Sequence, residues 1–224
     1  MELFHVINRG VDGRKIFHDD QDRARFVHDL YEFNDTAPAR EFLSIGASHA
    51  SSMSGRTTSR HRERIVNIHG WKLVGNHFHL LMSERMERGL SLFLSKLSGY
   101  ARYFNERHGR RGALFQGRTK RVPIETNAHF LYILHYIHLN ALDELPGFEL
   151  WRERDKGCIA NAQQAIEHLR ADRWSSFRDY CGIKNFPSIL TKNFFEDFPG
   201  DYEKALREYL ADRLFEQLEP RDLE

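Results

Sequence analysis

Cysteine is scarce in this chain, with only Cys158 and Cys181 among 224 residues. Two thiols cannot build a disulfide scaffold or a zinc site made mainly of cysteine. The scarcity therefore excludes the small disulfide-stapled domains and the Cys-rich zinc modules. It also fits a protein kept in a reducing compartment, so we expect a cytoplasmic location.

Long hydrophobic runs are also missing. A helix that crosses a bilayer needs about 20 mainly apolar residues, and no segment approaches that length. Residues 1–14 carry charge throughout, so no secretory signal is visible. The 41% of hydrophobic and 29% of charged residues are typical of a globular protein long enough for a full core. We expect no membrane partner.

The chain lacks an excess of charge of either sign, because its formal net charge is only +1. The charges are nevertheless unevenly distributed. Residues 96–121 hold eight basic residues and one acid, a local net charge of +7, whereas residues 196–224 hold ten acids and four bases, a local net charge of −6. A basic stretch inside a folded domain indicates a polyanionic partner, most often nucleic acid. The alternative interpretation is a solvated helix face.

Aromatic residues are interleaved with these cations. Tyr100, Tyr103 and Phe115 lie among the basic positions, and single-stranded bases stack on such rings. Phe104 recurs at helical spacing and is better explained as a core residue. The stretch therefore favours single-stranded nucleic acid as the partner, and a purely structural interaction protein would leave it unexplained.

Hydrophobic periodicity and turn residues predict the order strand, helix, strand, strand, helix, strand, followed by a further helix. The predicted elements are strands at 2–8, 66–74, 77–83 and 119–125, and helices after Asp19, over 90–108 and from Asn127. That order is the split βαβ pattern. We expect an α+β fold: a ferredoxin-like βαββαβ antiparallel sheet with helices on one face, plus a C-terminal helical extension.

The turns support this assignment. Gly75-Asn76 joins the two middle strands, and both residue types tolerate the positive φ that tight hairpins require. Pro123 cannot donate to a sheet ladder, so it marks the last strand as an edge strand.

Composition divides the chain into two parts. We expect a domain over residues 1–142, within which the Ser-, Gly- and Arg-rich region 34–64 is a mobile insertion. Residues 143–224 are expected to form a mainly helical extension, with helices over 162–169 and 202–218.

The segment His77-Phe78-His79 opens the second strand of the hairpin. Side chains two residues apart on a strand leave the same face, so both imidazoles point one way while Phe78 points the other. That spacing suits two ligands on one metal ion. The alternative interpretation is that both are structural histidines of the strand, with their ring nitrogens held by hydrogen bonds.

The helix from Asn127 carries a second pair of polar residues. Tyr136 and Asn140 stand four residues apart and share one helix face. If that helix crosses the sheet face of the two histidines, Asn140 is a third candidate ligand and Tyr136 a candidate nucleophile. Tyr132 is a second candidate nucleophile, and a core role for Tyr136 stays open. His135 and His138, on the same helix, are interpreted as solvated, and a role in orienting groups or contacting phosphate is the alternative.

These motifs, taken together, resemble the single-tyrosine HUH transposases of insertion sequences, and most closely the REP-associated tyrosine transposases. The resemblance covers roughly residues 3–182, interrupted by the 34–64 region. It rests on five stretches: His5-Val6-Ile7-Asn8-Arg9-Gly10 with Ile16-Phe17, His77-Phe78-His79, Gly112-Ala113-Leu114-Phe115-Gln116-Gly117-Arg118, Tyr136-Ile137-His138-Leu139-Asn140 and Trp174-Ser175-Ser176-Phe177.

The resemblance implies a metal-dependent enzyme that cleaves single-stranded DNA, often beside a hairpin, through a 5′-phosphotyrosine intermediate. It implies that His77, His79 and Asn140 bind a divalent ion, Mg²⁺ or Mn²⁺, that Tyr136 is the nucleophile, and that no nucleotide cofactor is needed. We expect DNA contacts from eight basic residues: Arg9, Lys96, Arg102, Arg110, Arg111, Arg118, Lys120 and Arg121.

The chain departs from the family pattern in its Ser-rich insertion and at two motifs. Val74-Gly75-Asn76 replaces the usual Met-Pro-Asn turn, and Asn140-Ala141-Leu142 replaces the usual Asn-Pro-Val. Neither change removes a catalytic group. The DNA substrate stays open, as does the question whether the enzyme still moves a genetic element. The choice between a homodimer and a monomer is open as well. The main alternative is a non-catalytic DNA- or RNA-binding module on the same fold.

Overall fold

The computed structural model describes residues 2–37, 62–124, 127–148, 151–152, 161–192 and 201–211, with the backbone alone for 127–131. Its centre is a four-stranded sheet in the order β2-β3-β1-β4, with every neighbouring pair antiparallel. This is the ferredoxin-like order, and the α+β class is confirmed. The strands are β1 (Leu3–Arg9), β2 (Val66–Val74), β3 (His77–Glu84) and β4 (Lys120–Ile124).

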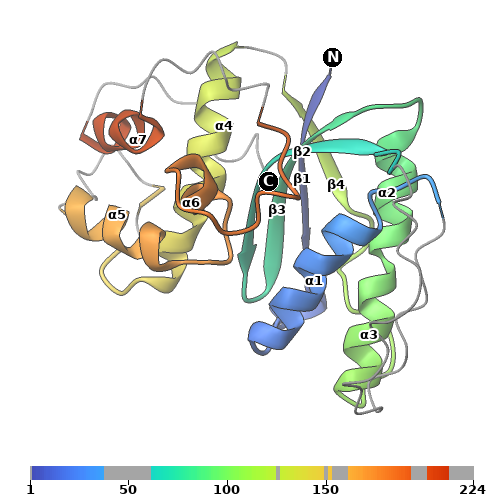
Figure 1. Ribbon diagram of the computed structural model, residues 1–224. Coiled ribbons are helices and arrows are strands. Elements are labelled where there is room, and N and C mark those ends of the chain that lie inside the picture. The colour runs from blue at the N-terminus through green and yellow to red at the C-terminus, as the bar shows by residue number, and fades with distance from the viewer. Residues whose placement is uncertain are drawn as a thin grey trace, which may run out of the picture.

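Three helices cover one face of the sheet (Figure 1). They are α1 (Asp20–Glu32), α2 (Gly89–Leu97) and α3 (Gly99–Arg107), and a short 3-10 turn, η1 (Val11–Gly13), precedes α1. Alternate strand residues such as Val6, Phe78 and Leu80 are buried beneath these helices in one hydrophobic cluster. Phe78 therefore faces away from its neighbouring histidines, as predicted.

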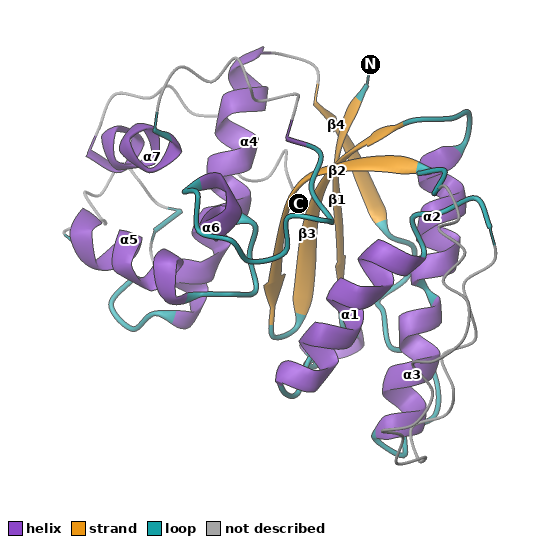
Figure 2. Ribbon diagram, viewed as in Figure 1, coloured by secondary structure: helices purple, strands orange, loops and turns teal. Residues whose placement is uncertain are grey.

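The remaining helices lie on the opposite side of the sheet (Figure 2). Leu81 is buried there with Ile133 and Leu134 in a second cluster. A Cβ at Gly70 of β2 would lie 2.7 Å from Leu134 Cδ1, so glycine allows close packing of the helix on the sheet. The helices are α4 (Asn127–Leu139), continued by the 3-10 segment η2 (Asn140–Glu144), then α5 (Ala162–Ala171), α6 (Phe177–Tyr180) and α7 (Tyr202–Ala211).

The β2–β3 turn differs from the prediction in its backbone. Neither Gly75 nor Asn76 is among the described residues with positive φ. The loop after β1 holds the turn instead, because Ile16 N–H donates to Gly75 O and Gly10 N–H donates to Asn76 O. Tertiary hydrogen bonds thus replace the local backbone preference that usually selects the turn type.

The single helix predicted over 90–108 is two helices. It breaks at Ser98, whose hydroxyl donates to Ser95 O at 2.6 Å, and α3 begins at the following Gly99. Ser-Gly pairs are common sites of helix kinks, because serine competes for backbone carbonyls and glycine adds flexibility. The prediction missed the break because the hydrophobic spacing continues across it.

The C-terminal extension is attached to the free edge of β2. Leu73 N–H donates to Trp174 O and Ser176 N–H donates to Trp71 O, both at 2.9 Å. The interpretation of His135 and His138 as solvated residues is wrong: both are buried, and the two ring nitrogens of His138 lie 2.7 Å from Tyr202 Oη and from Ser176 Oγ. The extension covers this side of α4, which helical spacing alone does not reveal.

Some expectations fall outside the described residues. The predicted insertion 34–64 has only its ends described, at 34–37 and 62–64, and the predicted helix 202–218 is described as far as Ala211. Most of the acidic segment 196–224 is likewise outside them. Within the described part of the chain, no helix combines the length and the apolar character that a bilayer crossing requires.

Burial of Asp29 on α1 predicts a pH-dependent stability. Its Oδ1 accepts from Arg25 Nε at 2.9 Å, whereas Oδ2 has no hydrogen-bond partner among the described residues. Burial raises the pKa of Asp29 to about 6, against the weaker opposing effect of Arg25. A raised carboxyl pKa stabilises the fold below about pH 4, and that contribution is lost as pH rises through about 6.

Asp29→Asn should remove this dependence, because the amide oxygen still accepts from Arg25. We expect the wild type, relative to the variant, to lose on the order of 2 kcal/mol of unfolding free energy between pH 4 and 7. Urea denaturation at several pH values measures the difference. Parallel pH curves for the two proteins would contradict the assignment.

Candidate catalytic site

The β1–β3 register gathers the histidines on one face. Ile7 pairs with His79 and Arg9 with His77, and directly opposed residues of antiparallel strands share a face. The His77 and His79 rings lie 4.8 Å apart between centroids. The face is the one that α4 covers, so the same-face prediction from the two-residue spacing is confirmed.

His79 is fully buried and oriented by a third histidine, His5 of β1. His79 Nδ1 lies 2.9 Å from His5 Nε2, and the two rings stack at 5.1 Å. His79 Nε2 has no hydrogen-bond partner among the described residues. Burial, with the nearby charges of other groups, holds the pKa of His79 well below its ordinary value. The ring is therefore neutral and has a buried nitrogen available as a ligand.

His77 lies at the mouth of the hairpin and is only half-buried. Its Nδ1 lies 2.6 Å from Asn76 Oδ1. An amide oxygen only accepts, so this contact assigns the proton to Nδ1 and leaves the lone pair on Nε2. The neighbouring asparagine thus fixes the tautomer that a ligand requires.

Tyr136 of α4 lies against the histidines. Its ring stands 5.9 Å from His79 and 6.0 Å from His5, edge-on to both, and is fully buried. Tyr132 lies one turn away, where its ring contacts Tyr209 of α7 at 5.9 Å. Tyr136 is therefore in direct contact with the histidine cluster.

Asn140 follows Tyr136 at the start of η2 and is fully buried. Its amide nitrogen donates to Tyr136 O at 2.7 Å, which leaves Oδ1 as the acceptor of this side chain. That oxygen accepts from Arg152 Nη2 at 2.7 Å. An amide oxygen has two lone pairs, so one remains for a second partner.

Arg152 links the polar groups of the site. Its guanidinium pairs with Asp143 at 2.5 and 2.9 Å and lies within hydrogen-bonding reach of the Tyr136 side chain. Burial lowers the pKa of Arg152, but these interactions more than offset it and raise the pKa overall. The neighbouring Trp151 ring lies 5.7 Å from the Tyr136 ring. Trp151 and Arg152 together cover the tyrosine.

The two strand histidines fit a divalent ion. A ligating histidine commonly uses its second nitrogen in a hydrogen bond that orients the ring, which His79 does through His5 and His77 through Asn76. The clearest single indication is Nε2 of His79, for which the described part of the chain offers no hydrogen-bond partner. Asn140 fits less directly, because Arg152 already shares its oxygen.

The eight basic residues predicted to contact DNA do not form one surface. Arg9 and Lys120 share the face of the histidines by strand register. Lys96 donates to the Asp35 and Ala37 carbonyls, which occupies its ammonium group. Arg102 forms an exposed pair with Glu106.

The others lie after α3 and along β4. Arg110 donates to Asn105 Oδ1 at 2.7 Å, and Arg111 is exposed in the following loop. Arg118 and Arg121 are exposed and line a groove of about 660 Å³ on the α2 side of the sheet. The remaining lining residues are Asn8, Ser91, Leu94, Ser95, Ser98, Phe115, Gly117 and Thr119.

Sequence reasoning missed three residues of the site. His5 has the strand parity of Leu3 and Ile7, but its approach to His79 depends on the β1–β3 register. Trp151 and Arg152 reach Tyr136 from a loop that carries no motif. Of the three, only His5 lay in a stretch that the motif analysis had singled out.

No protein-family model matches this chain, and no curated protein matches it. Among solved structures, it is similar to a REP-associated tyrosine transposase bound to a REP hairpin, with 10% sequence identity and a TM-score of 0.47. The match covers 85% of this chain and 84% of the other. At that identity and score, function has to be argued from the residues of this chain.

Proposed function

We propose that this protein is a metal-dependent single-stranded DNA endonuclease and strand transferase that acts through a 5′-phosphotyrosine intermediate, at hairpin or repeat sequences. The observation that carries the proposal is the contact of a buried tyrosine with a buried histidine, one ring nitrogen of which has no hydrogen-bond partner among the described residues. Tyr136 and His79 meet in this way on one sheet face.

The reaction is a transesterification. The Tyr136 oxygen attacks the scissile phosphorus, the bond from phosphorus to the 3′-oxygen breaks, and the tyrosine becomes linked to the 5′-phosphate. The phenolic proton leaves to solvent or a neighbouring base, and the departing 3′-oxygen takes up a proton. Bond energy is conserved in the phosphotyrosine, so a free 3′-hydroxyl can later reverse the step and join strands.

The histidines and Asn140 define the metal end of the site. His77 and His79 would hold the ion through Nε2, with Asn140 Oδ1 as a third ligand. A bound divalent ion supplies Lewis-acid polarisation of a phosphate oxygen. Arg152 contributes a fixed positive charge beside the attacking oxygen. Trp151, whose ring packs on that of Tyr136, has to move aside for DNA to reach the tyrosine.

Covalent capture tests the proposal. A labelled hairpin oligonucleotide with single-stranded flanks is incubated with the protein and Mg²⁺ or Mn²⁺, then resolved on a denaturing gel. We expect a protein–DNA adduct that requires the metal and is lost in His77→Ala. The half-buried position of His77 at the hairpin mouth makes it the safer of the two histidines to replace.

The burial of Tyr136 favours one second candidate. A fully covered tyrosine also suits a non-catalytic DNA- or RNA-binding module in which the histidines are structural. Salt-dependent binding is common to both functions and cannot separate them. Binding of the hairpin without any adduct, at every metal tested, would support the module.

Arg152→Ala should slow adduct formation about 100-fold, because removing one preoriented donor to a developing anion typically costs that much or more. Single-turnover rates measure the effect. Hairpin affinity should change by less than about threefold, since one phosphate contact is lost among several.

Arg173→Ala is the matched control. Arg173 is exposed and stacks over Trp174 at 5.0 Å, so its loss should leave the rate unchanged. Faster cleavage by Arg152→Ala would contradict the proposed role and would show that Arg152 blocks Asn140 instead.

A further inference from the structure

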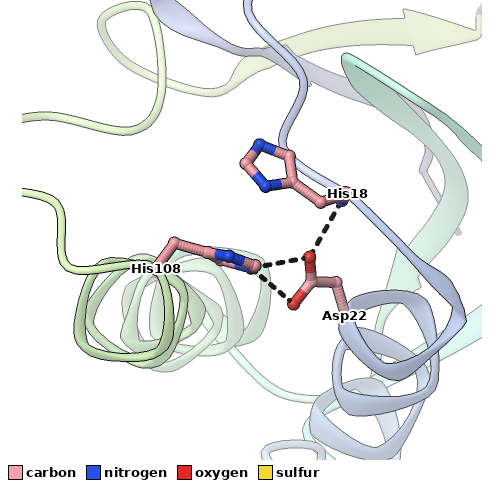
Figure 3. Close-up of side chains that lie close together, drawn as sticks. All are labelled: His18, Asp22 and His108. Carbon is pink, nitrogen blue, oxygen red and sulfur yellow. Dashed lines mark hydrogen bonds and ion pairs between the residues drawn. The ribbon is translucent and has the colours of Figure 1, made fainter.

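A second cluster of metal-ligating side chains lies on the α1–α3 side of the sheet, away from Tyr136. His18 precedes α1, Asp22 belongs to its first turn, and His108 caps the end of α3. Figure 3 shows the His108 ring pointing at the Asp22 carboxylate, with His18 beside them and its backbone N–H directed at the same carboxylate. One donor atom from each residue lies within 4.8 Å of the other two.

The donor spacing fits a shared ion. His108 Nε2 lies 3.0 Å from Asp22 Oδ2. Two donors bound to one zinc-class ion at ordinary bond lengths and angles are about 3.0–3.4 Å apart. An ion can therefore replace the proton now shared by these atoms with little movement of either residue. The third donor, His18, is exposed, so its ring can rotate toward the ion.

The carboxylate is held in place for this role. Asp22 is fully buried, its Oδ2 accepts from the His18 backbone N–H at 2.8 Å, and its Oδ1 accepts from Arg107. Hydrogen bonds of this kind orient a ligating carboxylate. Because of these hydrogen bonds, the Asp22 carboxylate keeps its position whether or not a metal ion is bound.

The local charge also favours a cation. Arg107 pairs with both Asp19 and Asp22, so one positive charge faces two negative ones. With neutral imidazoles, one negative charge is left uncompensated. Among the described residues, none forms a hydrogen bond with the ring of His18, which packs on Phe104 and His108. Its nitrogens are therefore available.

We propose that His18, Asp22 and His108 form a binding site for a divalent transition-metal ion of the zinc class. Two imidazoles and one carboxylate are borderline ligands suited to Zn²⁺ or Co²⁺, whereas Mg²⁺ and Ca²⁺ prefer all-oxygen sites. The bound ion ties the start of α1 to the end of α3, next to the basic loop of Arg110 and Arg111. The site is independent of the proposed catalysis.

Cobalt titration of the untagged full chain tests the site, with visible absorption as the readout. The background variant is His77→Ala, which removes the other candidate metal site. We expect one equivalent of Co²⁺ to bind this background, and Zn²⁺ to displace it. Adding His18→Ala or His108→Gln should weaken binding by more than about tenfold, because even an orienting partner of a ligand is typically worth that much.

These two substitutions keep the fold testable. His18 is exposed, and the glutamine amide in His108→Gln can still donate to Asp22. His28→Ala is the matched control, since His28 lies on α1 and, like His108, stands beside a carboxylate, here that of Asp29. Loss of Co²⁺ binding in the His18 and His108 variants, but not in the His28 variant, supports the site. No binding to the background protein, or equal affinity in all variants, overturns it.

Discussion

Tyr136→Phe should abolish the covalent adduct while hairpin binding stays within about twofold of wild type. The change removes one oxygen and keeps the ring that packs on His5, His79 and Trp151. A nucleophile that forms the intermediate cannot be bypassed, and such losses commonly exceed about 10⁴-fold in rate. Adduct yield on denaturing gels, together with binding by fluorescence anisotropy, measures both parts.

Tyr132→Phe provides the control. Tyr132 lies on the same helix, and its ring stands 6.0 Å from that of Tyr136. We expect normal adduct formation by this variant. Continued adduct formation by Tyr136→Phe would move the nucleophile elsewhere, and loss in Tyr132→Phe alone would move it one turn along α4.

Asp172→Asn should destabilise the fold by about 3 kcal/mol. Lys72 of β2 is fully buried, and its Nζ donates to Asp172 Oδ2 at 2.9 Å. Removing one partner of a buried ion pair leaves a charge without compensation, which costs roughly 3–5 kcal/mol. Glu144, at 3.8 Å from the same ammonium, keeps the expected loss near the lower limit. Urea denaturation at neutral pH measures it.

The control is an exposed pair. Glu106→Gln breaks the contact between Arg102 and Glu106, whose side chains are 84% and 64% exposed, and should change stability by less than about 0.5 kcal/mol. Because Asp172 ends α5, the first substitution should also loosen the C-terminal extension from β2. Equal effects of the two substitutions would contradict the importance of burial at Lys72.

Local patterns predicted most elements of the fold. A helix was predicted to follow Asp19, and the Asp19 side chain accepts from the N–H groups of Gln21 and Asp22 at the start of α1. The hairpin strands at 66–74 and from His77 were predicted from apolar runs and agree with β2 and β3. Each of these features depends on residues within a few positions of one another, which a sequence displays directly. The break at Ser98 escaped prediction because both halves of the helix share one apolar stripe.

The candidate site was predictable only in part. Strand parity sufficed to place His77 and His79 on one face, and helical spacing to align Tyr136 with Asn140. The contact between the histidine pair and the pair of Tyr136 and Asn140 depended on how α4 packs on the sheet, which the sequence does not show. Arg152 was not predictable, because a single arginine in a loop has no periodicity from which its partners follow.

The sequence by itself determined most of the elements, the α+β class and the direction in which each histidine of the hairpin points, because these follow from periodicity along short stretches of chain. Only the tertiary structure decided that His5 orients His79, that Trp151 and Arg152 cover Tyr136, and that His18, Asp22 and His108 converge. These contacts join residues from separate elements, and their geometry depends on strand register and helix packing that no local pattern encodes.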